Sequence, residues 1–197
     1  LAQQGHRVLL IDGDLRRPSL HKIFLFPSAT DTAKAGVEAP KPPGVVDCLV
    51  GETDLSQTVR RVAAREVDVT ALKESGRESF TTATGGELSI LAGGRRAPNP
   101  AELLGGASFG KLIAESARLF DRVVIDSAPI LAVRDTLLMM PHVQTVSLVV
   151  RAAKSPRTAI QRAMSLLPPP GARPTRTVLN PLPRLLPCRP PPPTPAT

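Results

Sequence analysis

Two short apolar runs that each end in aspartate constrain the fold of this 197-residue chain more than any other feature. Val8–Ile11 leads into Asp12 and Asp14, and Val123–Ile125 leads into Asp126. Such runs are typical of strands buried in a parallel sheet. Because side chains alternate faces along a strand, Asp12 and Asp14 share a face. Since ligands bind at the carboxyl edge of open α/β sheets, the pair of runs predicts an α/β fold with a carboxylate site at that edge.

An aspartate at the end of a strand also has a purely structural interpretation. It commonly caps the helix that follows, and for either run taken alone this interpretation is favoured. The occurrence of two such runs shifts the balance toward a shared ligand site.

The remaining pattern predicts a mostly parallel sheet with flanking helices. Two polar segments, 25–43 and 73–86, are expected to be exposed connections. Strands are expected near 8–11, 88–91, 122–126 and 146–150. Helices are expected near 18–24, 45–50, 54–64, 100–119 and 158–167. Asn99, Pro100 and Glu102 form a capping-box pattern that marks the start of the fourth helix.

The motifs resemble those of a known family, the bacterial tyrosine kinases (BY-kinases) of capsular and exopolysaccharide synthesis. These kinases are P-loop ATPases of the deviant Walker class. The resemblance covers roughly residues 1–165, in the family's order. Val8–Pro18 resembles the Walker A′ motif, Val123–Asp126 the Walker B strand, Ser127–Asp135 the segment after it, Pro98–Leu104 the Pro-Asn-Pro-x-Glu-Leu-Leu signature, and Gly44–Glu52 a helix and turn of the family. The resemblance implies a P-loop NTPase-like α/β domain that uses ATP and Mg²⁺.

Phosphoryl transfer assigns candidate roles to the strand-end residues. It requires magnesium between phosphate oxygens and a group that positions or deprotonates the attacking hydroxyl. Asp126 is the candidate for the metal's water shell, and Asp12 for either that shell or the proton of a tyrosine hydroxyl. Asp14 supports either task. Arg16 and Arg17 are candidates to contact phosphate or an acidic substrate, with a solvated basic turn as the alternative. Asn180 is a candidate adenine ligand, with a turn-forming asparagine as the alternative.

A complete Walker A sequence, Gly-x-x-x-x-Gly-Lys-Ser/Thr, is absent from the chain. Leu1–Gly5 is interpreted as the last turn of a helix, so the domain is expected to be incomplete at its start and to bind ATP poorly. Tyrosine is also absent. The expected substrate is therefore a tyrosine in another protein.

Composition changes sharply toward the carboxyl end. Residues 1–150 hold seventeen basic and seventeen acidic residues, whereas residues 151–197 hold eight basic residues and no acidic one. The net charge of +8 thus belongs to this stretch, and it does not indicate a nucleic-acid-binding domain. Thirteen of the 22 prolines also lie there. We expect a partial kinase-like domain over 1–167 and a disordered, proline-rich tail over 168–197, so that the domain is incomplete at both ends.

The family resemblance also implies partners and a location. It implies a membrane polysaccharide co-polymerase as activator, a homo-oligomer of the intact form, and a cytoplasmic site at the inner face of the membrane. Two alternatives stay open: a partition or division-site ATPase switch of the same superfamily, and a non-catalytic remnant that acts only through protein contacts. Arg16-Arg17-Pro18 and the Pro-Asn-Pro segment favour the kinase over the switch.

Overall fold

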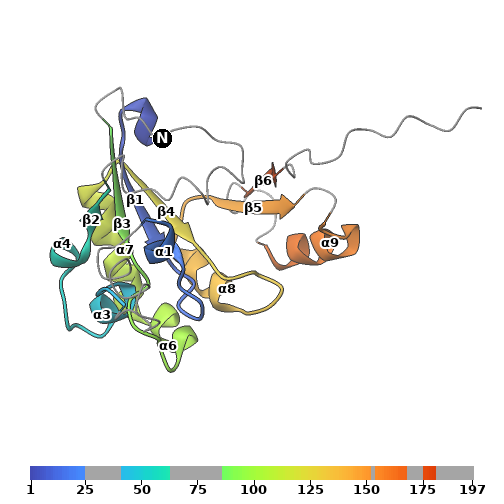
Figure 1. Ribbon diagram of the computed structural model, residues 1–197. Helices are drawn as coiled ribbons and strands as arrows, with labels where there is room; N and C mark the ends of the chain where they lie inside the picture. The colour runs from blue at the N-terminus through green and yellow to red at the C-terminus, as the bar shows by residue number, and fades with distance from the viewer. Residues whose placement is uncertain (25–40, 63–85, 152–153, 168–174, 181–197) are drawn as a thin grey trace, which may run out of the picture.

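The main sheet is built around the first aspartate-ended strand. In this computed structural model the described residues are 1–24, 41–62, 86–151, 154–167 and 175–180. Strand β1 (Arg7–Asp12) lies between β3 (Glu87–Leu91) and β4 (Arg122–Asp126), and it is parallel to both. The short β2 (Arg60–Arg61) pairs antiparallel with β3, which gives the order β2-β3-β1-β4 (Figure 1). The predicted mostly parallel sheet is confirmed.

A second sheet holds the last two described strands. β5 (Val146–Arg151) pairs in parallel with β6 (Thr175–Asn180). The prediction of disorder over 168–197 is therefore wrong for 175–180, because backbone pairing with β5 organises this stretch despite the prolines around it. The other residues of that tail lie outside the described part of the chain.

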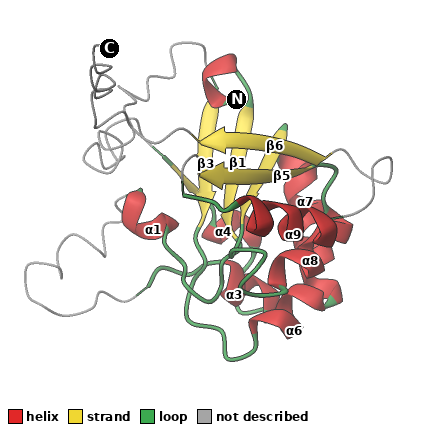
Figure 2. Cartoon of the chain, turned by 90° about the vertical axis from the view of Figure 1, so that its right-hand side faces the viewer, coloured by secondary structure: helices red, strands yellow, loops and turns green. Residues whose placement is uncertain are grey.

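Helices cover both faces of the main sheet, as its apolar strands require. One face packs against α1 (Leu20–Ile23) and the 3₁₀ turn η1 (Ala2–Gln4). The other face packs mainly against α3 (Val45–Leu49), α4 (Leu55–Thr58), α6 (Pro100–Gly105) and α7 (Ala107–Leu119). The remaining helical elements are α8 (Asp135–Met139), η3 (Met140–His142) and α9 (Arg157–Leu166). Figure 2 shows α1 on the opposite side of the view from α7 and α8.

The alternation of side chains along β1 explains this two-sided core. Leu9 and Ile11 belong to the core that includes Phe109 of α7, whereas Val8 belongs to the core that includes Leu20 of α1. Within the described residues, no helix combines the length and apolar character that a membrane crossing requires; the longest, α7, has 13 residues.

Several predicted boundaries are wrong. The helix expected over 54–64 ends at Thr58, and the chain then turns into β2. The helix expected over 100–119 is divided at Gly106, whose extended backbone separates α6 from α7. Asn99 begins α6 as predicted, but its amide contacts the Glu102 carboxylate at 3.3 Å instead of capping the backbone. Segments 25–40 and 73–85 of the expected connections lie outside the described residues.

Candidate functional site

Three aspartates form what we call the carboxylate cluster: Asp12, Asp14 and Asp126. Asp12 and Asp126 are paired in register as the last residues of β1 and β4. Asp14 lies two residues after Asp12, directly after Gly13. The Gly13 N–H donates to the Asp126 carbonyl oxygen at 2.8 Å and ties the two strand ends together. The predicted meeting of strand-end carboxylates at one sheet edge is thus what the backbone pairing produces.

Asp12 lies at the bottom of the cluster, with 0% of its surface exposed. Its Oδ2 accepts hydrogen bonds from the N–H groups of Ser19 (2.9 Å) and Leu20 (3.0 Å), at the start of α1. Its Oδ1 is buried and has no hydrogen-bond partner within the described part of the chain. Asp12 therefore anchors the turn between β1 and α1, and it retains one buried carboxylate oxygen without a described partner.

The other two carboxylates are closer to solvent. Asp126 is exposed, because β4 is the edge strand of the four-stranded sheet. Asp14 is half-buried, and its Oδ1 accepts hydrogen bonds from the N–H groups of Arg16 (3.2 Å) and Arg17 (3.0 Å). Asp14 and Asp126 are consequently the members that an incoming ligand meets first.

The pKa values of Asp12 and Asp126 are both raised by burial and by neighbouring carboxylates. Burial raises the pKa of Asp12; the amides of Leu20 and Ser19 oppose this shift, and the charges of Asp126 and Asp14 reinforce it. Desolvation raises the pKa of Asp126 as well, with a further contribution from Asp14. Both shifts show that the folded protein disfavours the ionised forms, so a cation between these groups would stabilise them.

The cluster suits magnesium better than a metal that demands a full protein cage. Across the described ranges, no group of three or more His, Cys, Asp or Glu side chains is arranged so that it could hold a metal ion by itself. Mg²⁺ keeps several waters and needs only one or two carboxylates. The unpaired Oδ1 of Asp12 and the raised pKa values fit such a partly hydrated cation beside Asp126.

The raised pKa of Asp12 gives a pH-dependent prediction. A carboxyl group whose pKa is raised by folding contributes stability that is complete below its unfolded pKa, about 3.9, and is lost as pH rises through the folded pKa. In Mg²⁺-free buffer, Asp12→Asn should therefore gain stability relative to the wild type as pH rises from about 4 to 7. Each kcal/mol regained raises the melting temperature by about 2–4 °C. Thermal denaturation over this pH series measures the difference in melting temperature between Asp12→Asn and the wild type.

The matched control is Asp54→Asn, which changes an exposed aspartate at the start of α4. A gap between Asp12→Asn and the wild type that stays constant with pH would contradict the prediction.

Arg16 has a different environment from the one predicted. Its guanidinium donates two hydrogen bonds to Asp135, at 2.7 and 3.0 Å, and Asp135 is 1% exposed. The ion pair joins the turn after β1 to the start of α8, and it engages the group that a phosphate would need. Sequence reasoning missed this role of Asp135, although the residue closes the segment that follows the Walker B-like strand.

Asn180 is not brought to the carboxylate cluster by any described contact. It ends β6 in the two-stranded sheet, where it lies opposite Arg151. Its predicted contact with adenine stays a prediction.

One near-match to a phosphate loop occurs at the start of α7. Gly105, Gly110 and Lys111 have the Walker A spacing, but Leu112 stands where the Ser or Thr belongs. Leu112 is buried in the core, and Gly110 lies inside the helix instead of a loop after a strand. This segment therefore does not fit a triphosphate.

No family model matches the chain. The tyrosine-protein kinase ptk of Acinetobacter johnsonii is 29% identical over 180 residues, which are 91% of this chain and 20% of ptk. CapB of Staphylococcus aureus is 28% identical over 182 residues, which are 92% of this chain and 65% of CapB. The chain thus spans less than two thirds of the length of either relative.

Solved structures show the same relationship. The VpsO kinase domain superposes with a TM-score of 0.64 at 29% identity, covering 91% of this chain and 72% of that domain. A cobyrinic acid a,c-diamide synthase from Mycobacterium smegmatis, solved with an ATP analog and magnesium, shares the fold alone, with a TM-score of 0.56 at 16% identity over 84% of this chain and 55% of that one. The resemblance to the bacterial tyrosine kinases is thus confirmed: the chain's curated homologues are such kinases, and its fold is that of a BY-kinase domain.

Proposed function

We propose that this chain carries the metal-binding and proton-accepting carboxylates of an ATP-dependent protein-tyrosine kinase of capsular or exopolysaccharide synthesis. The observation that supports this most directly is the carboxylate cluster, in which paired strand ends bring together aspartates with raised pKa values and an unpaired oxygen. Similarity to the tyrosine-protein kinase ptk supports the tyrosine specificity, and similarity to the VpsO kinase domain supports a kinase fold.

The positions of the three aspartates suggest separate roles. Asp126, exposed at the sheet edge, would hold the water shell of Mg²⁺, with the unpaired Oδ1 of Asp12 behind it. Magnesium would supply charge neutralisation for phosphate oxygens. Asp14 is the better candidate to orient or deprotonate a tyrosine hydroxyl, because Asp12 is fully buried and fixed by the amides of Ser19 and Leu20. The carboxylates thus prepare a metal and a nucleophile.

The nucleotide is a separate requirement. Because the 197 residues hold no complete Walker A sequence, we assign no residue of this chain to the β- and γ-phosphates, and Asn180 stays only a candidate for adenine. The M. smegmatis neighbour with its ATP analog and magnesium supports the choice of cofactors for the intact domain.

Partners follow from the same proposal. Because the chain has no tyrosine, its phosphate acceptor would be another protein. We propose a membrane polysaccharide co-polymerase as the activator, a homo-oligomer of the intact form, and a site at the cytoplasmic face of the membrane.

The test combines metal binding with phosphoryl transfer. Mg²⁺ should raise the melting temperature of the chain, and Asp126→Asn should abolish this rise. In a Mg²⁺-ATP assay of the intact form with an added tyrosine-containing protein, Asp126→Asn or Asp14→Asn should reduce phosphotyrosine formation by about 100-fold, as expected for loss of a group that stabilises or prepares the transition state. The control in both assays is Asp54→Asn, because Asp54 is exposed and lies outside the carboxylate cluster.

The other results separate the alternatives. ATP hydrolysis without transfer to tyrosine would favour the partition-type switch. Mg²⁺ binding with neither hydrolysis nor transfer would favour the non-catalytic remnant. Transfer that persists undiminished in Asp126→Asn would overturn the role given to the cluster.

A further inference from the structure

An open pocket of about 480 Å³ is lined in part by the turn that follows β1, two residues after Asp14. We call it the arginine pocket, and its lining residues are Arg16, Arg17, Arg96, Ala97, Pro98 and Pro100. The turn after β1 contributes one wall and the segment before α6 contributes the other. All of the charged residues in this lining are arginines, so the pocket is a concentrated positive region within residues 1–150, whose total charge is zero.

Within the described part of the chain, two of the three arginines in the pocket lining, Arg17 and Arg96, lack the carboxylate partner that Arg16 has. Four arginines, Arg7, Arg16, Arg61 and Arg95, form ion pairs with Asp or Glu. The guanidinium groups of Arg17 and Arg96 are exposed and form no ion pair with any described residue. Their charge is therefore available to an anion that enters the pocket.

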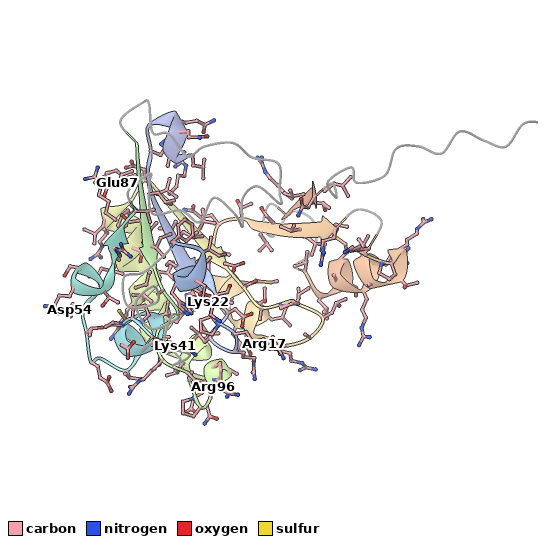
Figure 3. The ribbon with its side chains drawn as sticks, viewed as in Figure 1. Arg17, Lys22, Lys41, Asp54, Glu87 and Arg96 are labelled. Carbon is pink, nitrogen blue, oxygen red and sulfur yellow. The ribbon has the colours of Figure 1, made fainter. Side chains whose placement is uncertain are left out.

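The pocket is held next to the catalytic candidates by short connections. The backbone N–H of Arg17 donates to Asp14 Oδ1 at 3.0 Å, so the backbone of Arg17 is fixed directly against a member of the cluster. Pro18 packs against Gly93, where an added Cβ would lie 2.5 Å from the proline ring. Figure 3 shows Arg17 and Arg96 toward the same lower part of the molecule, with Lys22 and Lys41 in the same region of the view.

We propose that the arginine pocket binds acidic residues that flank the acceptor tyrosine of a protein substrate. The inference rests on the kinase proposal and adds a substrate class to it. Guanidinium groups bind carboxylates through paired, charge-assisted hydrogen bonds. Pro98 and Pro100 give the pocket stiff apolar walls against which an extended peptide can lie. An acidic side chain held by Arg17 and Arg96 places the neighbouring tyrosine near Asp14.

The structure permits the two charges to be removed without breaking the turn. Arg17 stabilises the turn through its backbone N–H, which every variant except proline retains. In Arg17→Gln/Arg96→Gln the carboxylate cluster and the Arg16–Asp135 pair stay intact. The matched control is Arg118→Gln/Arg157→Gln, which removes two exposed charges on α7 and α9, away from the pocket lining.

The experiment measures binding of a fluorescein-labelled peptide, Glu-Glu-Phe-Glu-Glu, by fluorescence anisotropy without ATP. Phenylalanine replaces tyrosine, so binding is tested independently of phosphoryl transfer. The pocket variant should weaken binding by about tenfold or more, as expected for loss of two charge-assisted contacts, and the control variant should leave it within about twofold. A peptide with Gln in place of Glu should bind weakly to all proteins. Melting temperatures establish that the variants are folded.

The proposal is overturned if both double variants lose affinity equally, because binding would then follow net charge alone. It is also overturned if the pocket variant binds the peptide as tightly as the wild type does. A third contradicting result would be that binding of inorganic phosphate or of anionic lipid vesicles requires Arg17 and Arg96, whereas binding of the peptide does not. Peptide binding that depends on these arginines, together with absence of phosphoryl transfer by the intact form, would preserve the pocket assignment and refute only the kinase proposal.

Discussion

Phe109→Ala is expected to lower the free energy of unfolding by about 3–5 kcal/mol, the range for truncating a fully buried aromatic side chain. Phe109 is 0% exposed and is the largest of the fully buried side chains among the described residues. It lies on α7, in the core that also contains Leu9 and Ile11 of β1. Its ring stands edge-on to the ring of His142, with 5.6 Å between the ring centroids. Its removal leaves a cavity at the junction of the sheet, α7 and η3.

Urea denaturation followed by circular dichroism measures this loss. Leu119→Ala is the matched control on the same helix, because Leu119 is 45% exposed, and it should change the free energy of unfolding by no more than about 0.5 kcal/mol. A loss below about 1 kcal/mol for Phe109→Ala would mean that α7 does not pack on the sheet as described.

The second large effect is expected from Gly13→Ala, which should lower the free energy of unfolding by about 2–4 kcal/mol and abolish stabilisation by Mg²⁺. A Cβ at this position would lie 2.6 Å from the Asp126 carbonyl oxygen and 2.9 Å from Cγ2 of Ile125. The first of these atoms belongs to the backbone, so the ends of β1 and β4 must separate. The hydrogen bond from Gly13 to Asp126 is then lost, and the carboxylate cluster loses its spacing.

Gly105→Ala provides the comparison. Its Cβ would meet Leu138 only at ordinary contact distance, 3.7 Å, and alanine favours the helix that Gly105 ends. This variant should retain both its stability and its response to Mg²⁺. If Gly13→Ala instead keeps the wild-type melting temperature and Mg²⁺ response, the spacing of the two strand ends is not what forms the site.

The main strands were predictable because they are locally encoded. Short apolar runs specify strands with few neighbouring residues, and β1, β3, β4 and β5 lie close to their predicted positions. The expected burial holds for β1, whereas β4 is partly exposed because it is an edge strand. Element boundaries were less predictable. The backbone of Gly106 divides a continuous helical pattern, and Arg60 and Arg61 form β2 only because β3 offers an edge to pair with.

In the candidate site too, features set by short sequence patterns were predictable, whereas contacts between residues far apart in the chain were not. The register that sets Asp12 opposite Asp126 follows from two strand patterns, so the sequence predicted the carboxylate cluster. The pairing of Arg16 with Asp135 spans 119 residues, and no local pattern indicates it. The burial of Asp12 under the amides of Ser19 and Leu20 likewise depends on how α1 folds back over the strand end.

The sequence by itself therefore determined the parallel α/β architecture, the family resemblance and the meeting of the strand-end aspartates, because alternation and strand-end chemistry act over a few residues. Only the tertiary structure decided which charges are compensated. It gives Arg16 a buried partner and brings Arg17 and Arg96, 79 positions apart in the chain, into the lining of one pocket. The physical reason is that the strength of an ion pair depends on burial and on distances between segments remote in the chain, which only packing fixes.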